Sequence, residues 1–354
     1  MTRPRDFRWP LVDGYQVAQM RNLHGQAQTI KSIAISLSGD YVAVHCSDEK
    51  IHMWSTATRQ EVAKLAHAMP VERFAFTDER GSLLVLHEQG GLRWEKVWKH
   101  NVMKWLKSKF SGWDFGPQPV FARTEGRLAT ANKAGELTVW TYHGTGAPQR
   151  PQRLFVRPSI SAMQFVEDGE ALVGGTSDGL LWYARSAGGS LRSLQVFDQA
   201  ITSIDVDNEA GRALVSFADG HAVLFNLQPG AGVERTYAPE EASRSSFGAL
   251  FAAGGKAVVY GTSQGCALVW DTLKAQVVYG MNNSEDDPIT CAAAFDGHDG
   301  KPGYILTGSK SGQIVWWAQP SCALSVPVVS SETNFVSRVA ASSKKRTVKK
   351  EPAT

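Results

Sequence analysis

The chain has 354 residues, of which 43% are hydrophobic and 20% charged, a composition that allows a sizeable buried core. The formal net charge is +3, but Ser343 to Thr354 alone carry +4, which leaves −1 for the rest and argues against a basic nucleic-acid-binding surface. No apolar run follows the first ten residues, and no run of eighteen apolar residues occurs anywhere. We therefore expect neither a secretory signal peptide nor a membrane-spanning segment.

The first regular unit of the sequence, after an expected N-terminal extension over residues 1–13, contains four short strands. Residues 30–36 alternate apolar and polar side chains, and Tyr41 to His45 runs back to a turn at Ser47-Asp48. Ile51 to Trp54 and Glu61 to Leu65 supply the third and fourth strands. Alternating runs separated by turn residues are typical of hairpins, so this stretch is expected to form one antiparallel sheet.

The third strand of this unit recurs along the chain. A turn containing Asp or Gly is followed by alternating apolar residues and then by an aromatic, as in Asp48 to Trp54 and Gly135 to Trp140. Aligned on the turn, the copies end at positions 54, 95, 140, 184, 225, 270 and 317, at intervals of 41 to 47 residues. One small sheet cannot bury both of its faces, but sheets stacked radially can, so we predict an all-β propeller.

These features resemble WD40 repeats, and the resemblance covers Tyr15 to Val326. The third-strand aromatic, the turn before it and the period match that family, although most units lack its histidine or its aspartate. The resemblance implies a single seven-bladed WD40-type β-propeller over residues 14–329, which binds partner proteins through its loop face. It also implies a hydrogen-bond network of His24, Asp48 and Trp54 in the first blade. Further residues with implied structural roles are Trp140, Phe225, Trp270 and Trp317.

Two segments are candidates for the strand that completes the last blade. Tyr15 to Met20 alternates and precedes the first blade, and an N-terminal strand usually closes the ring in the resembling family. Cys322 to Val326 lies as far beyond Trp317 as other fourth strands lie beyond their aromatics. We favour the N-terminal strand, because closure of this kind removes an exposed sheet edge.

The least regular segment, residues 94–113, contains four of the eleven tryptophans and several lysines. Its apolar residues recur at nearly helical spacing, so it is either an amphipathic helix or an extended fourth strand with a long loop. Exposed tryptophans beside lysines would form a hot spot for a partner, whereas the alternative is that the rings pack on blade 2 while the lysines stay in water. The candidate binding residues of this segment are Trp98, Lys104, Trp105 and Lys107.

Two of the loops that lead into inner strands are acidic. They contain Glu240-Glu241 and Glu285-Asp286-Asp287. Together with Asp178 and Asp219, these residues would form a negative patch over blades 4 to 7 that suits a basic peptide. The alternative is that the loops are polar only because they are solvated.

Motifs that look catalytic have simpler structural explanations. Gly175 to Gly179 and Gly261 to Gly265 both match the G-x-S-x-G nucleophile elbow, but both precede a strand, whereas the elbow requires a helix. The carboxylates of Asp205, Asp207 and Glu209 are assigned to the end of a strand and its hairpin rather than to a cation site. No catalytic residue, metal ligand or cofactor is therefore predicted.

The four cysteines, Cys46, Cys266, Cys291 and Cys322, show neither CxxC spacing nor histidine partners at the spacing of a metal site. They are expected to be free thiols, buried or partly buried.

Residues 330–354 are rich in Ser, Lys and Arg and are expected to form a disordered basic tail. Lys344 to Lys350 resembles a nuclear-localisation signal, so a nuclear or cytoplasmic location is expected. The predicted function is a non-catalytic scaffold that binds protein or peptide partners, within a larger complex. The alternatives are a reader of basic peptides such as histone tails, and a propeller hydrolase, which would need carboxylates or histidines converging from the inner strands.

Overall fold

A computed structural model describes residues 15–19, 27–67, 69–77, 82–87, 91–95, 114–117, 120–132, 134–142, 149–155, 159–238, 247–262, 265–281, 287–297, 301 and 303–318. The chain divides into two compact units, Met1–Pro320 and Ser321–Thr354, and all of the described residues belong to the first. The predicted N-terminal extension and the predicted basic tail both lie outside them.

The described strands form seven four-stranded antiparallel sheets, here called blades and numbered in chain order. Blade 1 contains β2 (Ile30–Ile35), β3 (Tyr41–Cys46), β4 (Lys50–Ser55) and β5 (Glu61–Ala66). Blade 2 contains β6 (Val71–Phe76), β7 (Leu83–His87), β8 (Gly91–Glu95) and β9 (Asp114–Pro117). Blade 3 contains β10 (Val120–Thr124), β11 (Arg127–Ala131), β12 (Glu136–Thr141) and β13 (Gln149–Phe155).

Blade 4 contains β14 (Ile160–Val166), a single 3-10 turn η1 (Glu167–Gly169), β15 (Ala171–Thr176), β16 (Leu180–Arg185) and β17 (Arg192–Val196). Blade 5 contains β18 (Ile201–Asp207), β19 (Arg212–Phe217), β20 (Ala222–Asn226) and β21 (Val233–Tyr237). Blade 6 contains β22 (Leu250–Ala252), β23 (Ala257–Gly261), β24 (Ala267–Asp271) and β25 (Gln276–Met281). Blade 7 contains β26 (Ile289–Phe295), β27 (Tyr304–Ser309), β28 (Gln313–Ala318) and β1 (Tyr15–Gln19).

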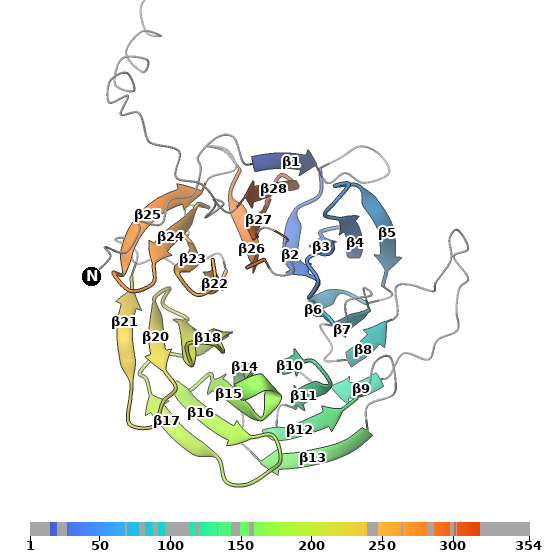
Figure 1. Ribbon diagram of the computed structural model, residues 1–354. Coiled ribbons are helices and arrows are strands. Elements are labelled where there is room, and N and C mark those ends of the chain that lie inside the picture. Colours follow the sequence, from blue (N-terminus) through green and yellow to red (C-terminus); the bar gives the residue numbers. More distant parts are fainter. Residues whose placement is uncertain are drawn as a thin grey trace, which may run out of the picture. The chain divides into compact units, whose positions relative to one another are not determined.

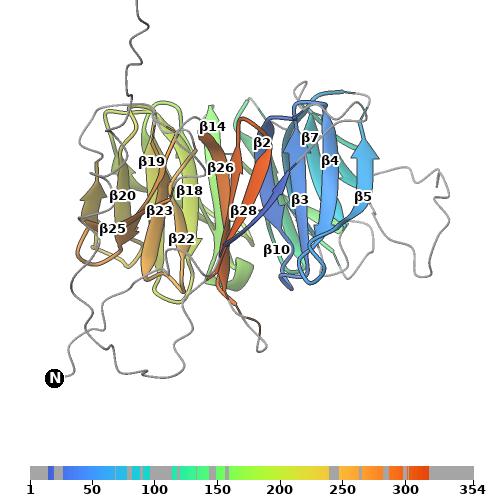
Figure 2. The ribbon, with the colours of Figure 1, turned by 90° about the horizontal axis from the view of Figure 1, so that it is seen from above.

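The blades stand around a ring, with the first strand of each nearest the middle (Figure 1). Seen at right angles, the strands run between two faces, on which the turns and loops lie (Figure 2). Each of the seven apolar clusters joins one pair of neighbouring blades, and one of them joins Ile30 and Val44 of blade 1 to Leu306 and Ile314 of blade 7. The predicted all-β propeller with four-stranded antiparallel blades is confirmed.

The N-terminal strand closes the ring. β1 pairs antiparallel with β28, with Tyr15 opposite Trp317 and Gln19 opposite Gln313. Blade 7 therefore takes its outer strand from one end of the chain and its other three strands from the opposite end, which covers an edge that would otherwise be exposed. The preference for an N-terminal closing strand is confirmed, and the alternative segment Cys322 to Val326 lies outside the described residues.

The blades share local irregularities as well as topology. The inner strands of blades 1, 2, 4, 5 and 7 each shift register between their first and third residues. Blades 1, 3, 4, 5 and 6 shift again between the third and fourth strands, next to the third-strand aromatic or bulky residue. Bulges that recur at one place in a repeat re-aim the strand in the same way in each copy.

Glycines allow the blades to approach each other closely. A Cβ at Gly308 of β27 would lie 2.6 Å from Ile30 of blade 1, and a Cβ at Gly175 of β15 would lie 2.3 Å from Ile201 of blade 5. Hydroxyls bridge the same two seams: Ser161 donates to Ile201 O at 2.5 Å, and Thr290 donates to Ile30 O at 2.5 Å. The absence of a side chain at these glycines is thus a packing requirement between blades.

We predict that Gly308→Ala lowers the free energy of unfolding by about 1–3 kcal/mol, because overpacking displaces well-packed neighbours. Gly232→Ala is the matched control, since a Cβ there meets no atom within 4 Å. We expect a change of less than about 0.5 kcal/mol for that variant. Urea denaturation measures both, and equal stabilities of the two variants would contradict this account of the seam.

Candidate binding face

One face of the ring is built from the turns between second and third strands and the loops that lead into inner strands. The turns of the six blades in which this turn is described each contain a residue in the left-handed region. Glycine supplies it in five of them, as in Gly179 (φ 87°), Gly220 (φ 94°) and Gly312 (φ 88°). Blade 1 places Glu49 there instead, at φ 57°. The predicted Asp- or Gly-containing turns therefore position this face.

Three exposed carboxylates lie on this face over blades 4 and 5. Asp178 and Asp219 belong to the turns of those blades, and Asp198 belongs to the loop between them. The loop is held against both turns, because Phe197 N–H donates to Gly179 O at 2.9 Å and Ala218 N–H donates to Ala200 O at 3.0 Å. We call Asp178, Asp198 and Asp219 the acidic rim.

Aromatic rings support the acidic rim from below. Phe197 packs edge-on against Phe217, with ring centroids 4.8 Å apart, and Phe217 stacks on His221 at 4.3 Å. His221 Nδ1 lies 2.5 Å from Asp219 Oδ1. From blade 6, the Tyr260 hydroxyl donates to Gly220 O. The two turns and the loop thus form one supported surface.

A hydroxyl or amide at the end of the second strand fixes several of these turns. Thr176 Oγ1 accepts from Leu180 N–H at 2.9 Å and donates to Asp178 Oδ1. Thr262 and Ser309 accept from the corresponding N–H groups at 3.1 and 3.0 Å. Ser177 lies in a turn between β15 and β16, and β24 follows Gly265, so both G-x-S-x-G segments precede strands, as expected.

Asp287 does not belong to the acidic surface on which it was placed. It is 5% exposed, and its carboxylate accepts from Ser309 Oγ at 2.5 Å and from Ser311 N–H at 2.7 Å. The carboxylate fixes the turn of blade 7, so its oxygens face hydrogen-bond donors inside the protein rather than an external partner. The prediction that Asp287 is a binding residue is therefore corrected.

The other predicted binding residues lie outside the described residues. They are Glu240, Glu241, Glu285, Asp286, Trp98, Lys104, Trp105 and Lys107, together with the predicted structural residue His24. β8 ends at Glu95 and β9 begins at Asp114, so most of the tryptophan-rich segment connects the third and fourth strands of blade 2.

The third-strand aromatics pack in the clusters between blades. Trp140 donates to Thr130 Oγ1 at 3.3 Å and Trp317 donates to Thr307 Oγ1 at 2.9 Å, each to the preceding strand of its own blade. Phe225 and Trp270 lie in the clusters on either side of blade 5, and Trp54 packs against Trp316, with ring centroids 6.2 Å apart. Asp48 contacts Lys50 and His52, and no hydrogen bond joins it to Trp54 among the described residues.

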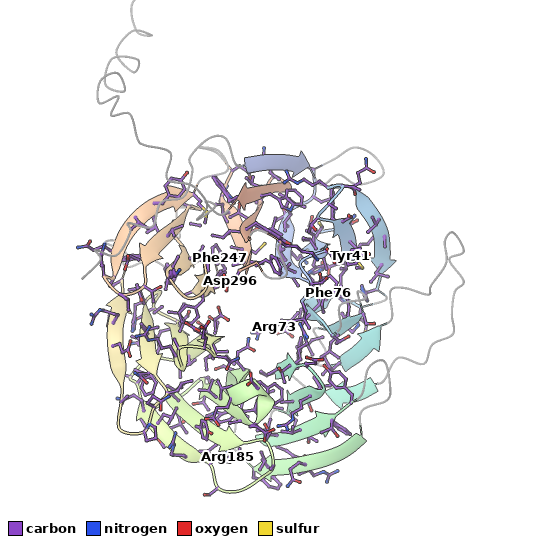
Figure 3. All side chains as sticks on the ribbon, in the orientation of Figure 1. Tyr41, Arg73, Phe76, Arg185, Phe247 and Asp296 are labelled. Atoms are coloured by element: carbon purple, nitrogen blue, oxygen red, sulfur yellow. The ribbon has the colours of Figure 1, made fainter. Side chains whose placement is uncertain are left out.

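The opposite face holds a pocket of about 520 Å³ between blades 4 and 5. Arg192 lies over the ring of Tyr183 at 4.7 Å, and the Tyr183 hydroxyl donates to Glu167 at 2.8 Å. Arg185, labelled in Figure 3, and Glu209 also line it. Side chains of both charges line this pocket, so its lining favours neither an anionic nor a cationic ligand.

Few acidic or basic side chains lie on the described inner strands. They are Lys31, Glu72, Arg73, Arg123, Asp205 and Asp207. Arg73 and Asp296, which follows β26, both lie toward the middle of the ring (Figure 3). As expected, Asp205 and Asp207 are at the end of a strand that leads into a hairpin.

The described part of the chain contains no helix with the length and apolar character needed to cross a membrane. Cys46, Cys266 and Cys291 are free thiols, as expected, and two of them are buried. The sequence matches no model of a known protein family and no curated protein.

Asp205 connects blade 5 to blade 6, because its Oδ2 accepts from Phe251 N–H at 2.7 Å. Burial, which the backbone donors of Phe251 and Val206 offset only in part, raises its pKa from 3.8 to about 6, and the charges of Asp296 and Asp207 add to this. The folded state therefore holds a proton on Asp205 more tightly than the unfolded chain does. The stability that this group contributes is present below pH 3.8 and is lost as the pH rises to about 6.

We predict that Asp205→Asn removes this pH dependence, since the amide oxygen can still accept from Phe251 N–H but carries no charge. Between pH 4 and pH 7, the free energy of unfolding of the variant should rise by about 1–2 kcal/mol relative to that of the wild type. This is less than the full pKa shift implies, because Asp205 keeps some contact with water. Urea denaturation of both proteins across this range measures the difference. A difference that is constant with pH would show that Asp205 titrates normally.

Proposed function

We propose that this chain is a WD40-type propeller that acts as a non-catalytic interaction scaffold, and that its acidic rim binds a basic segment of a partner protein. The observation that carries the proposal is the grouping of Asp178, Asp198 and Asp219 as exposed carboxylates on one face. Asp219 pairs with a histidine, His221, rather than with a lysine or arginine. Lysine and arginine side chains complement such a surface.

The WD40 assignment rests on the repeat itself. The 41- to 47-residue period, the turn before the third strand and the aromatic at its end resemble that family. The indole-to-threonine hydrogen bonds of blades 3 and 7 support the same reading, because they tie the third strand to the second at equivalent places.

A scaffold role fits the way the face is built. Tyr260 from blade 6 and Phe217 from blade 5 hold the turns from below, so the carboxylates are presented on a supported surface rather than on free loops. A preorganised surface loses less conformational entropy when it binds an extended peptide. Histone tails are one source of such basic peptides, and Lys344 to Lys350 remains a proposed nuclear-import signal.

We predict that the variant Asp178→Asn, Asp198→Asn, Asp219→Asn loses partners that bind through basic segments. Asparagine keeps an acceptor for each turn while removing three negative charges, so affinity for a Lys/Arg-rich peptide should fall about 10- to 100-fold at physiological ionic strength. Fluorescence anisotropy with a labelled peptide measures the affinity, and affinity purification from the native cells with mass spectrometry compares the partners.

The matched control is Glu125→Gln, Asp168→Asn, Glu209→Gln, which removes the same charge from exposed turns on the opposite face. We expect it to bind as the wild type does. Equal loss in both variants would mean that net charge alone governs binding, and unchanged binding by the rim variant would place the partner elsewhere on the protein.

A further inference from the structure

A group of three side chains on the β3–β4 hairpin of blade 1 has the chemistry of a metal site. Cys46 ends β3, Asp48 lies in the turn and His52 lies on β4. The Cys46 sulfur, an Asp48 carboxylate oxygen and a His52 ring nitrogen all lie within 4.8 Å of one another. Cys46 and His52 are buried, and the Asp48 side chain is 10% exposed.

The strand register brings these side chains together. Val44 lies opposite His52 in the β3–β4 pair, and side chains alternate along a strand, so Cys46 and His52 share one face of the sheet. That face packs against blade 7, where Cys46 belongs to the cluster that contains Cys291 and Ile314. The group therefore lies at the seam where the ring closes.

Turn geometry does not account for the cysteine. Thr176, Thr262 and Ser309 occupy the equivalent place in other blades, and each accepts from the N–H four residues further on. In blade 1, Lys50 N–H donates to Asp48 Oδ1 at 3.2 Å instead, which leaves the Cys46 thiol without that role. A hydroxyl would stabilise the turn better than a thiol, because sulfur is a weak acceptor.

His52 is oriented as a metal ligand. Its Nδ1 lies 2.9 Å from Glu61 Oε2, so Nδ1 carries the proton that is donated to this carboxylate. Its Nε2 is buried and makes no hydrogen bond, and Asp48 Oδ1 lies 3.5 Å away. A lone pair at Nε2 therefore faces the other two side chains. Metal-binding histidines are commonly held by a carboxylate on their second nitrogen in this way.

Negative charge adjoins the group, because Asp48 belongs to it and Glu61 contacts His52. Asp48 Oδ1 lies on the side of His52, whereas Asp48 Oδ2 contacts Lys50 Nζ at 3.1 Å.

We propose that Cys46, Asp48 and His52 bind a transition-metal cation, with Zn²⁺ as the expected ion and Glu61 as the residue that positions His52. A ligand set of one thiolate, one imidazole and one carboxylate suits Zn²⁺ rather than Ca²⁺ or Mg²⁺, which prefer oxygen. Tetrahedral Zn²⁺ places such ligand atoms about 3.3–3.8 Å apart, so the three atoms need only small movements. A water molecule would complete the coordination.

Binding replaces the S–H bond of Cys46 by a sulfur–metal bond, and the proton passes to solvent. Asp48 contributes a carboxylate lone pair, and His52 contributes the lone pair at Nε2. Because all three ligands are brought together by folding, the metal binds the folded state and stabilises it. The expected role is to strengthen blade 1 at the seam with blade 7, away from the acidic rim of blades 4 and 5.

The test uses the tag-free full-length chain, stripped with a chelator and titrated with Co²⁺ as a spectroscopic substitute for Zn²⁺. We expect one equivalent to bind with thiolate-to-cobalt charge-transfer absorption, and Zn²⁺ to displace it and raise Tm. Cys46→Ser should abolish the absorption. Cys291→Ser, a buried cysteine in the same cluster, should retain it. Absence of charge-transfer absorption in the folded wild type, or its persistence in Cys46→Ser, would overturn the proposal.

A second pair of variants leaves the three ligands intact. Glu61→Gln should weaken metal binding about 10- to 100-fold, the usual effect of losing the carboxylate behind a ligating histidine. Glu49→Gln is the control, because Glu49 contacts His45 in the same hairpin and does not contact His52. Competition with a fluorescent chelator measures both affinities, and equal affinities of the two variants would show that Glu61 does not position a metal ligand.

Discussion

Burial of both faces of every blade is the constraint on which this fold depends. The second strands are buried almost along their whole length, as in β7 and β15, although a four-stranded sheet has no core of its own. The apolar side chains on each face must therefore meet those of the next blade, and seven clusters do so around the ring. Stability is consequently shared between neighbours, and closure by β1 is part of the core rather than an addition to it.

The period of the sequence predicts most of this architecture, because the physics that repeats is local. A turn that needs a left-handed residue, a run of alternating side chains and an aromatic at its end can each be read from a few residues. The N-terminal closing strand could also be predicted, since an alternating segment before the first blade has no partner of its own. The degenerate copy that contains Trp182 still aligns, because its turn at Asp178-Gly179 keeps the repeat in register.

Site residues were harder to predict, because their environment is set by partners distant in sequence. Asp287 follows two acidic residues and looks solvated, but its carboxylate meets Ser309 and Ser311 of the next hairpin. Asp198, which no motif marks, lies on the rim because its loop bonds to the turns on either side. Cys46 and His52 are six residues apart, and only the register of β3 against β4 shows that they share a face.

The acidic rim is partly a by-product of turn chemistry. Asp178 accepts from Thr176, and Asp219 accepts from His221 N–H at 3.2 Å, so both residues have structural reasons to be aspartate. No such hydrogen bond accounts for Asp198 among those described, which makes its charge the most informative of the three.

Blade 1 departs from the repeat at three positions of a single hairpin. One hairpin contains Glu49 where other blades use glycine, Cys46 where blades 4, 6 and 7 use a hydroxyl, and a buried histidine at position 52. Sequences usually break local rules where another requirement outweighs them, and a cation held by this hairpin would account for the cysteine and the histidine together.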